Sequence, residues 1–485
     1  MICAVIKGPT LTEVRDQLKR AMNGASIVEL RLDFFAPEAL KHLQQLLNDF
    51  SLPMIFTLRP LDQGGAFSGS EERRLEQIRN FAKLKPAYFD LEYTIPAQFA
   101  SELKEEHPQI QIIISFHDFD KMPPLEATLS KLKKVQGDLY KIAVMPHSSV
   151  EALSLLNFMR SHRSNVLAMG MGLYGKITRI LAPIFGGRFV YASLEVELAT
   201  AEGQITVADL NTIYHYTDLS PSTAIYGLIG NPLGTSFGYL THNAVMQAVG
   251  LDAVYLNFPL YPDQLKQFLE LAKTVDIKGL SATMPLKEMC IPYLDQIDPW
   301  AKKAGSVNTL KIEQGKISGC STDGDGALDS IEEKMPVKGK KVIFIGAGGA
   351  CRAAASVAIL RGAEVIILNR DEERAIKLAD ELGCKGGSLT QLKVEFQRGY
   401  QVLINATPAP MPIDPELILP RSIVMDMVIS PIETPFLLEA KKRGCSLVYG
   451  YEMFANQAVG QFHFWFSKKI TPDTIKRVVW DRVKR

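Results

Sequence analysis

The segment VIFIGAGGACRAAASVAIL, residues 342–360, decides the fold of the C-terminal part of the chain. Its four apolar residues from Val342 to Ile345 predict a buried strand. The run Gly346-Ala347-Gly348-Gly349 predicts a tight turn, and the alanine-rich stretch that follows predicts a helix. A strand, a glycine turn and a helix in this order expose backbone amides at a helix N-terminus, where a pyrophosphate can bind. We therefore expect a nucleotide-binding α/β domain here.

The next predicted strand, residues 364–368, indicates which nucleotide is bound. It leads into Asn369 and Arg370, where an NAD-binding protein carries an acidic residue for the ribose hydroxyls, and Arg374 lies one helical turn later. Guanidinium groups suit a 2′-phosphate, so this Rossmann domain is expected to bind NADP(H). The plain alternative is a structural glycine turn with solvated arginines.

The first 215 residues alternate short apolar segments with helical patterns, which is typical of βα units around a parallel sheet. The expected strands lie near residues 2–6, 26–32, 54–59, 87–92, 110–116, 138–144, 165–170 and 188–194. Eight such units predict a (β/α)8 TIM barrel, with its active site at the C-terminal ends of the strands. The polar stretch Thr217–Ser222 predicts the end of this domain, which we place at residues 1–218.

The composition argues against several classes of function. Lys and Arg number 54 against 53 Asp and Glu, and a net charge of +1 offers no field to attract nucleic acid or a membrane. The six cysteines lie far apart, so we expect reduced thiols and no metal. No apolar run approaches the roughly 20 residues that span a bilayer. We expect a cytoplasmic protein with small-molecule substrates. The sequence does not decide whether the protein forms a homo-oligomer.

Charged side chains gather at the predicted C-terminal ends of the barrel strands. They are Glu29 and Arg31 on the second strand, Arg59 on the third, Glu92 on the fourth, His117 on the fifth and Lys141 on the sixth. Each alone has a plain explanation, because a lone lysine can reach solvent and a lone histidine can lie in a core. Their shared position at one barrel mouth instead indicates a site for a ligand.

Lys141 is the candidate nucleophile of this site. An apolar interior disfavours the charged form of a lysine, and a neutral amine can attack a ketone to form an imine. The iminium acidifies the neighbouring carbon, so His117 is suited to remove a proton and later to protonate a leaving hydroxyl. We expect Glu92 to fix the tautomer of that imidazole and the arginines to hold carboxylate and hydroxyl groups.

Residues 1–215 resemble the type I 3-dehydroquinate dehydratases. The matching segments are Val28–Asp33, Phe56–Arg59, Asp90–Glu92, Ser115–Phe119, Lys141–Pro146 and Gly203–Ile205. The resemblance implies that Lys141 forms the imine and that His117 is the acid and base. It also implies a pocket shaped by Glu29, Arg31, Arg59, Glu92, Arg179, Thr200 and Gln204. Thr200 stands where the family usually has a serine, and it keeps the hydroxyl.

Residues 224–466 resemble the shikimate dehydrogenases. The matching segments are Gly230–Pro232, His242–Asn243, Thr283–Glu288, Gly305–Thr309, Thr322–Gly324, Asn369–Arg370, Asn405–Thr407 and Gly450–Gln457. The resemblance implies a substrate-binding domain at residues 222–335, completed by residues 452–485, and a Rossmann domain at residues 336–451. The expected reaction is reduction of 3-dehydroshikimate to shikimate with NADPH, so the product of one site is the substrate of the other.

By the same resemblance, Lys287 and Asp323 form the catalytic pair, in which the ammonium stabilises developing charge on oxygen and the carboxylate holds it. Substrate contacts are implied for Ser236, Thr283, Asn308 and Gln457. Cofactor contacts are implied for Gly346, Gly348, Gly349, Ala350, Asn369, Arg370, Arg374, Thr407 and Gly450. Gly238 replaces a serine of the family's carboxylate site, and Ile429 replaces a tyrosine, so the preference for shikimate or quinate stays open.

Two other functions remain as alternatives. One is a quinate or shikimate dehydrogenase that uses NAD, against which Arg370 and Arg374 argue. The other is a ligand-sensing regulator built on degenerate enzyme domains. The joint presence of Lys141, His117 and the Lys287–Asp323 pair argues against the regulator.

Overall fold

The computed structural model describes residues 1–201, 203–234, 236–466 and 470–483. Its backbone contacts divide the chain into two compact units. Unit 1 consists of Met1–Ala224 with Asp252–Asp276, and unit 2 consists of Ile225–Leu251 with Ile277–Arg485. Within the described residues, no helix has both the length and the apolar character needed to cross a membrane.

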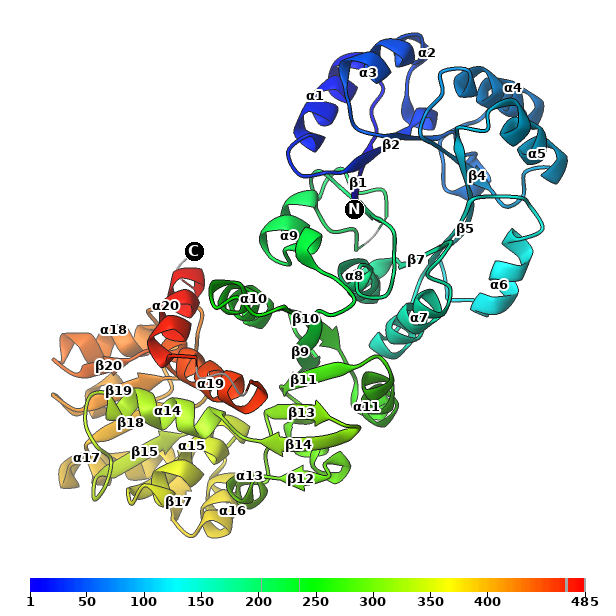
Figure 1. Cartoon of the computed structure of the whole chain (residues 1–485). Coiled ribbons are helices and arrows are strands. Elements are labelled where there is room, and N and C mark those ends of the chain that lie inside the picture. Colours follow the sequence, from blue (N-terminus) through cyan, green and yellow to red (C-terminus); the bar gives the residue numbers. More distant parts are fainter. Residues whose placement is uncertain (202, 235, 467–469, 484–485) are drawn as a thin grey trace. The chain divides into compact units, whose positions relative to one another are not determined.

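Unit 1 contains an eight-stranded parallel sheet that curls into a barrel (Figure 1). Its strands are β1 (Ile2–Ile6), β2 (Ile27–Arg31), β3 (Met54–Thr57), β4 (Tyr88–Glu92), β5 (Gln111–Asp118), β6 (Leu139–Val144), β7 (Val166–Gly170) and β8 (Val190–Ala192). The order is β7-β6-β5-β4-β3-β2-β1-β8, and β1 pairs with both β2 and β8. The expected TIM barrel is therefore confirmed.

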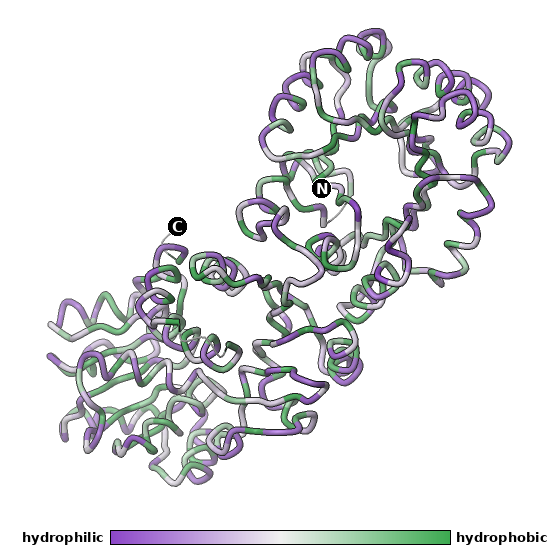
Figure 2. The backbone as a smooth tube through the Cα atoms, in the orientation of Figure 1, coloured by the Kyte–Doolittle hydropathy of each residue, from purple (hydrophilic) through white to green (hydrophobic). Residues whose placement is uncertain are grey.

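Helices surround the barrel, with polar residues outside and apolar residues along the strands (Figure 2). They are α1 (Leu11–Ala21), α2 (Pro37–Leu40), α3 (Leu43–Asp49), α4 (Glu71–Ala82), α5 (Ala97–Glu106), α6 (Leu125–Leu132), α7 (Ser149–Ser161), α8 (Gly172–Leu181) and α9 (Val207–Thr212). Thr10 caps α1 and Ser148 caps α7, so these helices begin where a side-chain oxygen accepts a backbone hydrogen bond.

The barrel interior changes from apolar to charged along each strand. Ile113 and Leu139 belong to an apolar layer in the interior. Side chains alternate along a strand, so Ser115 and Lys141, two residues further on, lie on the same interior face. Ser115 and Lys141 are also direct partners in the β5–β6 register. The polar layer thus lies toward the C-terminal ends of the strands, as this fold requires for its active site.

A mixed six-stranded sheet forms the substrate lobe that follows the barrel. Its strands are β9 (Ala224–Gly230), β10 (Ala253–Pro259), β11 (Ile277–Ala282), β12 (Gln296–Ile297), β13 (Thr309–Glu313) and β14 (Lys316–Cys320), in the order β10-β9-β11-β13-β14-β12. The helices are α10 (Gly238–Ala248), α11 (Leu265–Thr274), α12 (Leu286–Met289) and α13 (Pro299–Ala304).

The third sheet is parallel and has the strand order of a Rossmann domain, β17-β16-β15-β18-β19-β20. Its strands are β15 (Lys341–Ile345), β16 (Glu364–Asn369), β17 (Lys385–Ser388), β18 (Val402–Asn405), β19 (Ile423–Asp426) and β20 (Ser446–Val448). Its helices are α15 (Gly349–Leu360), α16 (Glu372–Leu382), α17 (Leu392–Arg398) and α18 (Pro435–Lys442). The predicted strand, glycine turn and helix from Val342 to Leu360 are confirmed.

Two helices connect the substrate lobe with this nucleotide lobe. Helix α14 (Asp323–Glu332) leads from β14 toward β15, and α19 (Gly450–Trp465) follows β20 and packs along α14. Gly326 permits this close packing, because a Cβ atom there would lie 2.7 Å from the backbone nitrogen of Gln457. The last helix, α20 (Pro472–Val483), packs on α10 and α19.

Candidate active sites

The C-terminal ends of the barrel strands enclose a pocket. Its lining includes Lys141, His117, Glu29, Arg31, Arg59, Arg179, Thr200 and Gln204. The structure therefore brings together eight of the nine barrel residues expected to form the site. The ninth, Glu92, is fully buried and does not line the pocket.

Lys141 contacts a carboxylate in the barrel interior. Its Nζ donates a hydrogen bond to Asp90 Oδ2 at 3.0 Å and lies 4.0 Å from Glu29 Oε1. The same nitrogen lies 3.9 Å from the centre of the Tyr191 ring. The surroundings of Lys141 thus differ from the apolar interior expected from the sequence, because one face of the amine meets acidic groups.

Asp90 is a site residue that the sequence analysis did not single out. Its Oδ1 accepts hydrogen bonds from Arg59 Nη2 at 2.7 Å and from Ser115 Oγ at 2.6 Å. Burial by itself raises the pKa of this carboxyl, but Arg59 and Lys141 outweigh it and hold the pKa below the usual range. Asp90 is therefore a carboxylate at neutral pH and can orient the amine of Lys141.

His117 is a neutral imidazole next to this carboxylate cluster. Burial, followed by the positive charges of Arg59 and Lys141, lowers the pKa of the ring well below its ordinary value. Its Nδ1 lies 3.3 Å from Arg59 Nη1, and its ring stacks on Phe119 with centroids 6.0 Å apart. A ring that stays neutral at neutral pH can accept a proton from a substrate carbon.

The expected contact between Glu92 and His117 was wrong. In the described part of the chain, Glu92 Oε2 accepts a hydrogen bond from Arg74 Nη1 at 2.7 Å, and Oε1 lies 3.4 Å from Arg59 Nη1. Arg74, on α4, is 2% exposed and also pairs with Glu71. These guanidinium groups attract both oxygens of Glu92. Glu92 therefore positions Arg59, and Arg59 is the residue that contacts the imidazole of His117.

Arg179 connects the last two barrel strands and keeps an uncompensated charge. Its Nε donates to Gly170 O of β7 at 3.0 Å, and its Nη1 donates to Tyr191 O of β8 at 2.9 Å. Burial lowers the pKa of this guanidinium to about 10. Among the described residues it forms no ion pair, so this buried cation is suited to bind an anionic group of a ligand.

Arg31, Thr200 and Gln204 complete the rim of the pocket. Arg31 is held by Asp33 through two hydrogen bonds, Nε to Oδ1 at 3.0 Å and Nη2 to Oδ2 at 2.7 Å. The backbone nitrogen of Thr200 donates to Gln204 Oε1 at 2.8 Å. Thr200 and Gln204 both lie between β8 and α9, and this hydrogen bond joins two residues that line the pocket.

A second lysine–carboxylate pair lies in unit 2. Lys287 Nζ donates to Asp323 Oδ2 at 2.5 Å, and the two residues come from α12 and from the first position of α14. Asn308 Nδ2 donates to Asp323 Oδ1 at 2.8 Å and to Thr322 Oγ1 at 3.0 Å. The carboxylate therefore has one oxygen for Lys287 and the other for Asn308, which fixes its orientation.

Gln457 contacts a neighbour of this pair, Thr283 follows β11, and Ser236 lies just before α10. The hydroxyl of Thr322 donates to Gln457 Oε1 at 3.4 Å. Thr283 directly follows β11, and its backbone nitrogen donates to Ile229 O at 2.9 Å. Ser236 Oγ accepts a hydrogen bond from the amide of Gly238 at 3.2 Å. Thr322 is a further residue of this site that the sequence analysis did not single out.

The glycine turn after β15 leaves space for a dinucleotide. A Cβ atom at Gly348 or Gly349 would meet no atom within 4 Å, so the N-terminus of α15 is open to a phosphate. Gly346 has a φ of +113°, and a Cβ there would lie 2.8 Å from Thr407 Cγ2. Glycine is thus required at Gly346 by backbone conformation and by the close approach of Thr407. The residues present fit the pyrophosphate of NADP.

The other expected cofactor residues lie at the same edge of the Rossmann sheet. Asn369 ends β16, and Arg370 and Arg374 are both exposed, with no ion pair among the described residues. Asp371 caps α16 by accepting from the backbone nitrogen of Arg374 at 3.2 Å. Ala350 is the second residue of α15, and Gly450 is the first of α19. Two free guanidinium groups fit the extra phosphate of NADP.

No group of three or more His, Cys, Asp or Glu side chains suited to hold a metal ion occurs among the described residues. All six cysteines are free.

Three family models match the chain in succession. They describe type I 3-dehydroquinase (residues 2–221), the shikimate dehydrogenase substrate-binding domain (228–310) and shikimate/quinate 5-dehydrogenase (329–428). The chain is 31% identical to a "Shikimate biosynthesis protein AroDE" of Chlamydia pneumoniae, over 98% of this chain and 97% of the relative.

It is also 31% identical to a "Bifunctional 3-dehydroquinate dehydratase/shikimate dehydrogenase, chloroplastic" of Arabidopsis thaliana, over 96% of this chain and 82% of the relative. A crystal structure of a shikimate dehydrogenase in complex with NADP+ matches 55% of this chain and 98% of its own, with 34% identity and a TM-score of 0.52. The chain belongs to the family of bifunctional proteins that join a type I 3-dehydroquinate dehydratase to a shikimate dehydrogenase.

Proposed function

We infer that the chain catalyses two consecutive steps of the shikimate pathway. Unit 1 dehydrates 3-dehydroquinate to 3-dehydroshikimate, and unit 2 reduces 3-dehydroshikimate to shikimate with NADPH. The observation that carries this inference is the presence of two lysine–carboxylate pairs, Lys141–Asp90 and Lys287–Asp323. The first pair lies within the match to type I 3-dehydroquinase, and Lys287 lies within the match to the substrate-binding domain. A ligand-sensing regulator has no need for either pair.

In unit 1, we propose that Lys141 Nζ passes a proton to a base of the pocket and attacks the ketone of 3-dehydroquinate, and that loss of water gives an imine. Asp90 orients the amine before the attack and stabilises the positive charge of the iminium that follows. The iminium withdraws electrons from the neighbouring carbon, and His117 removes a proton from it. The same imidazole then returns the proton to the leaving hydroxyl, and hydrolysis releases Lys141.

The substrate carboxylate is assigned to Arg179. This guanidinium is buried, carries its charge without an ion pair in the described part of the chain, and lines the same pocket as Lys141. A charge-assisted pair with a carboxylate satisfies it and fixes the substrate relative to the amine. Arg31 and Arg59 already form ion pairs with Asp33 and Asp90. We therefore assign them to the hydroxyl groups of the substrate.

In unit 2, NADPH supplies a hydride when it is bound at the glycine turn. Lys287 stabilises the negative charge that develops on the substrate oxygen and donates a proton to it. Asp323 holds the ammonium in place, and Asn308 holds Asp323. The exposed amides at Gly348 and Gly349 and the guanidinium groups of Arg370 and Arg374 are assigned to the pyrophosphate and the 2′-phosphate.

A coupled assay tests the whole inference. The full chain is supplied with 3-dehydroquinate and NADPH, and shikimate formation is followed together with NADPH oxidation. Lys141→Ala should stop shikimate formation from 3-dehydroquinate but not from added 3-dehydroshikimate. Lys287→Met should allow 3-dehydroshikimate to accumulate. A chain that consumes neither substrate would contradict the inference.

A further inference from the structure

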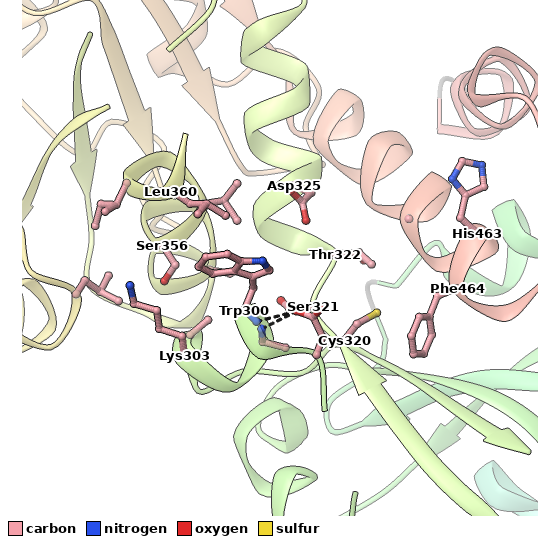
Figure 3. Close-up of a pocket in the computed structure, with 18 residues that line it drawn as sticks. Trp300, Lys303, Cys320, Ser321, Thr322, Asp325, Ser356, Leu360, His463 and Phe464 are labelled. Carbon is pink, nitrogen blue, oxygen red and sulfur yellow. Dashed lines mark hydrogen bonds between the residues drawn. The ribbon is translucent and has the colours of Figure 1, made fainter. Parts of the chain in front are cut away.

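Unit 2 contains a cavity of about 500 Å³ that belongs to neither active site (Figure 3). Its walls come from α13 of the substrate lobe, from α15 of the nucleotide lobe, and from the connecting helices α14 and α19. Neither Lys287 nor Asp323 lines it, and neither does the glycine turn after β15. The cavity therefore lies beside the catalytic pair, where the two lobes meet.

One wall of the cavity is apolar. Trp300, on α13, keeps 52% of its surface exposed, and Leu360, on α15, keeps 47%. Figure 3 shows the Trp300 ring lying next to Leu360 and Ser356 of α15. Val357 lines the same face of that helix, three residues before Leu360. Large apolar side chains left open at the mouth of a cavity favour a ligand with a planar or alicyclic ring.

Two polar groups at this cavity, the Lys303 ammonium and the Ser321 hydroxyl, are suited to bind an anion. In the described part of the chain, the Lys303 ammonium has no ion pair, and the buried Ser321 Oγ has no hydrogen-bond partner. The two acidic residues at the cavity are already engaged. Asp298 Oδ1 caps α13 by accepting from the backbone nitrogens of Trp300 and Ala301, and Asp325 Oδ1 pairs with Arg361 at 2.8 Å.

Thr322 separates the cavity from the catalytic pair. It lines the cavity, and its hydroxyl accepts a hydrogen bond from Asn308, which also holds Asp323. Gly460, which also lines the cavity, packs against Thr322, where a Cβ atom would lie 2.9 Å from Thr322 Cγ2. A ligand in the cavity thus touches the residue on which the orientation of Asn308 depends.

We propose that this cavity is a second small-molecule site, which binds an anionic group carried on a planar apolar ring. Trp300 and Leu360 contact the ring, and Lys303 and Ser321 bind the anion. Occupancy of the cavity is coupled to substrate binding at Lys287 and Asp323 through Thr322. By thermodynamic reciprocity, shikimate then changes the affinity of the cavity for its ligand by the same factor.

The probe is 1-anilinonaphthalene-8-sulfonate, a fluorescent aromatic sulfonate, titrated into the full chain with NADP+ at saturation so that the nucleotide site is filled. We expect saturable binding. Lys303→Met should raise the Kd about fivefold, the upper range for a partly exposed ion pair. Lys302→Met is the matched control, because Lys302 lies on the same helix but does not line the cavity, and it should leave the Kd unchanged.

A second variant tests the apolar wall. Leu360→Asp places a carboxylate against the ring and should abolish binding, whereas Ile376→Asp, at an exposed residue of α16, should not. Reduction of 3-dehydroshikimate without the probe should continue in all four variants, which shows that they fold. Addition of shikimate should shift the probe Kd at least about threefold in the unmodified chain.

Three results would overturn the proposal. Equal probe affinity in Lys303→Met and Leu360→Asp places the probe elsewhere. An unchanged Kd in the presence of shikimate refutes the coupling. Self-association of the unmodified chain that Leu360→Asp abolishes identifies a second copy of the chain, and no small anion, as the group that covers this cavity.

Discussion

Asp90 Oδ2 accepts a hydrogen bond from Lys141 Nζ at 3.0 Å, and both residues are buried in the barrel. We predict that Asp90→Asn lowers kcat for dehydration about 100-fold, because the amine loses the charge that orients it and that stabilises the iminium. Initial rates of 3-dehydroshikimate formation measure this. Asp138→Asn removes a carboxylate that pairs with Lys104 at the surface, and it should leave the rate unchanged.

Borohydride identifies the nucleophile. In the presence of 3-dehydroquinate it should attach a stable adduct to Lys141, because only an imine is reduced to a secondary amine. Mass spectrometry of the digested protein locates the label. The adduct should be absent in Lys141→Ala, while that variant still reduces 3-dehydroshikimate. A label on any other lysine would refute the assignment of Lys141.

The barrel site shows what the sequence can and cannot reveal. Alternation along β4 places Asp90 and Glu92 on the same interior face, so a buried acidic pair is predictable from Asp90-Leu91-Glu92. Which of these two carboxylates contacts Lys141 depends on the positions of the side chains along the barrel axis. The register pairs Glu92 with Ser115, and Ser115 with Lys141, but Asp90 is the residue whose side chain reaches the amine.

The role of Glu92 could not be predicted from the strands, because its hydrogen-bond partner comes from helix α4. Arg74 lies on α4, in a charged stretch that is typical of an exposed helical face, yet it is almost fully buried. Its guanidinium attracts Glu92 away from His117. In unit 2 the Lys287–Asp323 pair was expected from resemblance alone, because the two residues are 36 positions apart and only the fold of the substrate lobe brings them together.

Arg74 should stabilise unit 1 strongly through Glu92. We predict that Arg74→Met lowers the free energy of unfolding by about 3–5 kcal/mol, because it leaves a buried carboxylate with only the longer contact to Arg59. Urea unfolding measures this. Arg79→Met, which removes a half-exposed pair with Glu102, should cost less than about 1 kcal/mol. In the double variant with Glu92→Gln, part of the loss should return, since no charge is then left unpaired.

The pH dependence of dehydration should reflect the neutral state of His117. Its pKa in the folded chain lies well below the ordinary value of about 6.5, so the ring loses its function as a base only when the pH falls below that lowered pKa. We predict that kcat/KM for 3-dehydroquinate stays level as the pH falls through 6.5. The same shift destabilises the fold at acid pH, because below 6.5 the unfolded chain binds a proton that the folded chain does not. A half-maximal rate near pH 6.5 would contradict this.

The free guanidinium groups at the Rossmann edge should set the cofactor preference. We predict that kcat/KM for NADPH exceeds that for NADH at least about tenfold, or about 1.4 kcal/mol, because Arg370 and Arg374 have no other anion to bind in the described structure. Arg370→Ala should reduce the ratio. Arg398→Ala, at an exposed arginine of α17 that pairs with Glu395, is the control and should not change it. Equal efficiency with both cofactors in the unmodified chain would refute the assignment.

Gly238, at the start of α10, stands in place of a serine of the family. Its amide donates to Ser236 Oγ, so this hydroxyl accepts one bond and keeps its own proton for a substrate carboxylate. Gly238 is buried, and it is not among the described glycines with positive φ, so its backbone does not forbid a side chain. A second hydroxyl at this place would add an interaction worth about 0.5–1.5 kcal/mol.

Gly238→Ser should therefore lower the KM for 3-dehydroshikimate several-fold and change kcat little, because the carboxylate is bound alike in the ground state and the transition state. Steady-state kinetics of reduction measures both constants. If the new side chain has no room beside His242, whose Nδ1 lies 3.0 Å from Gly238 O, KM will rise and the melting temperature will fall. A fall in kcat at unchanged KM would contradict both outcomes and would mean that this segment acts on the reacting carbonyl itself.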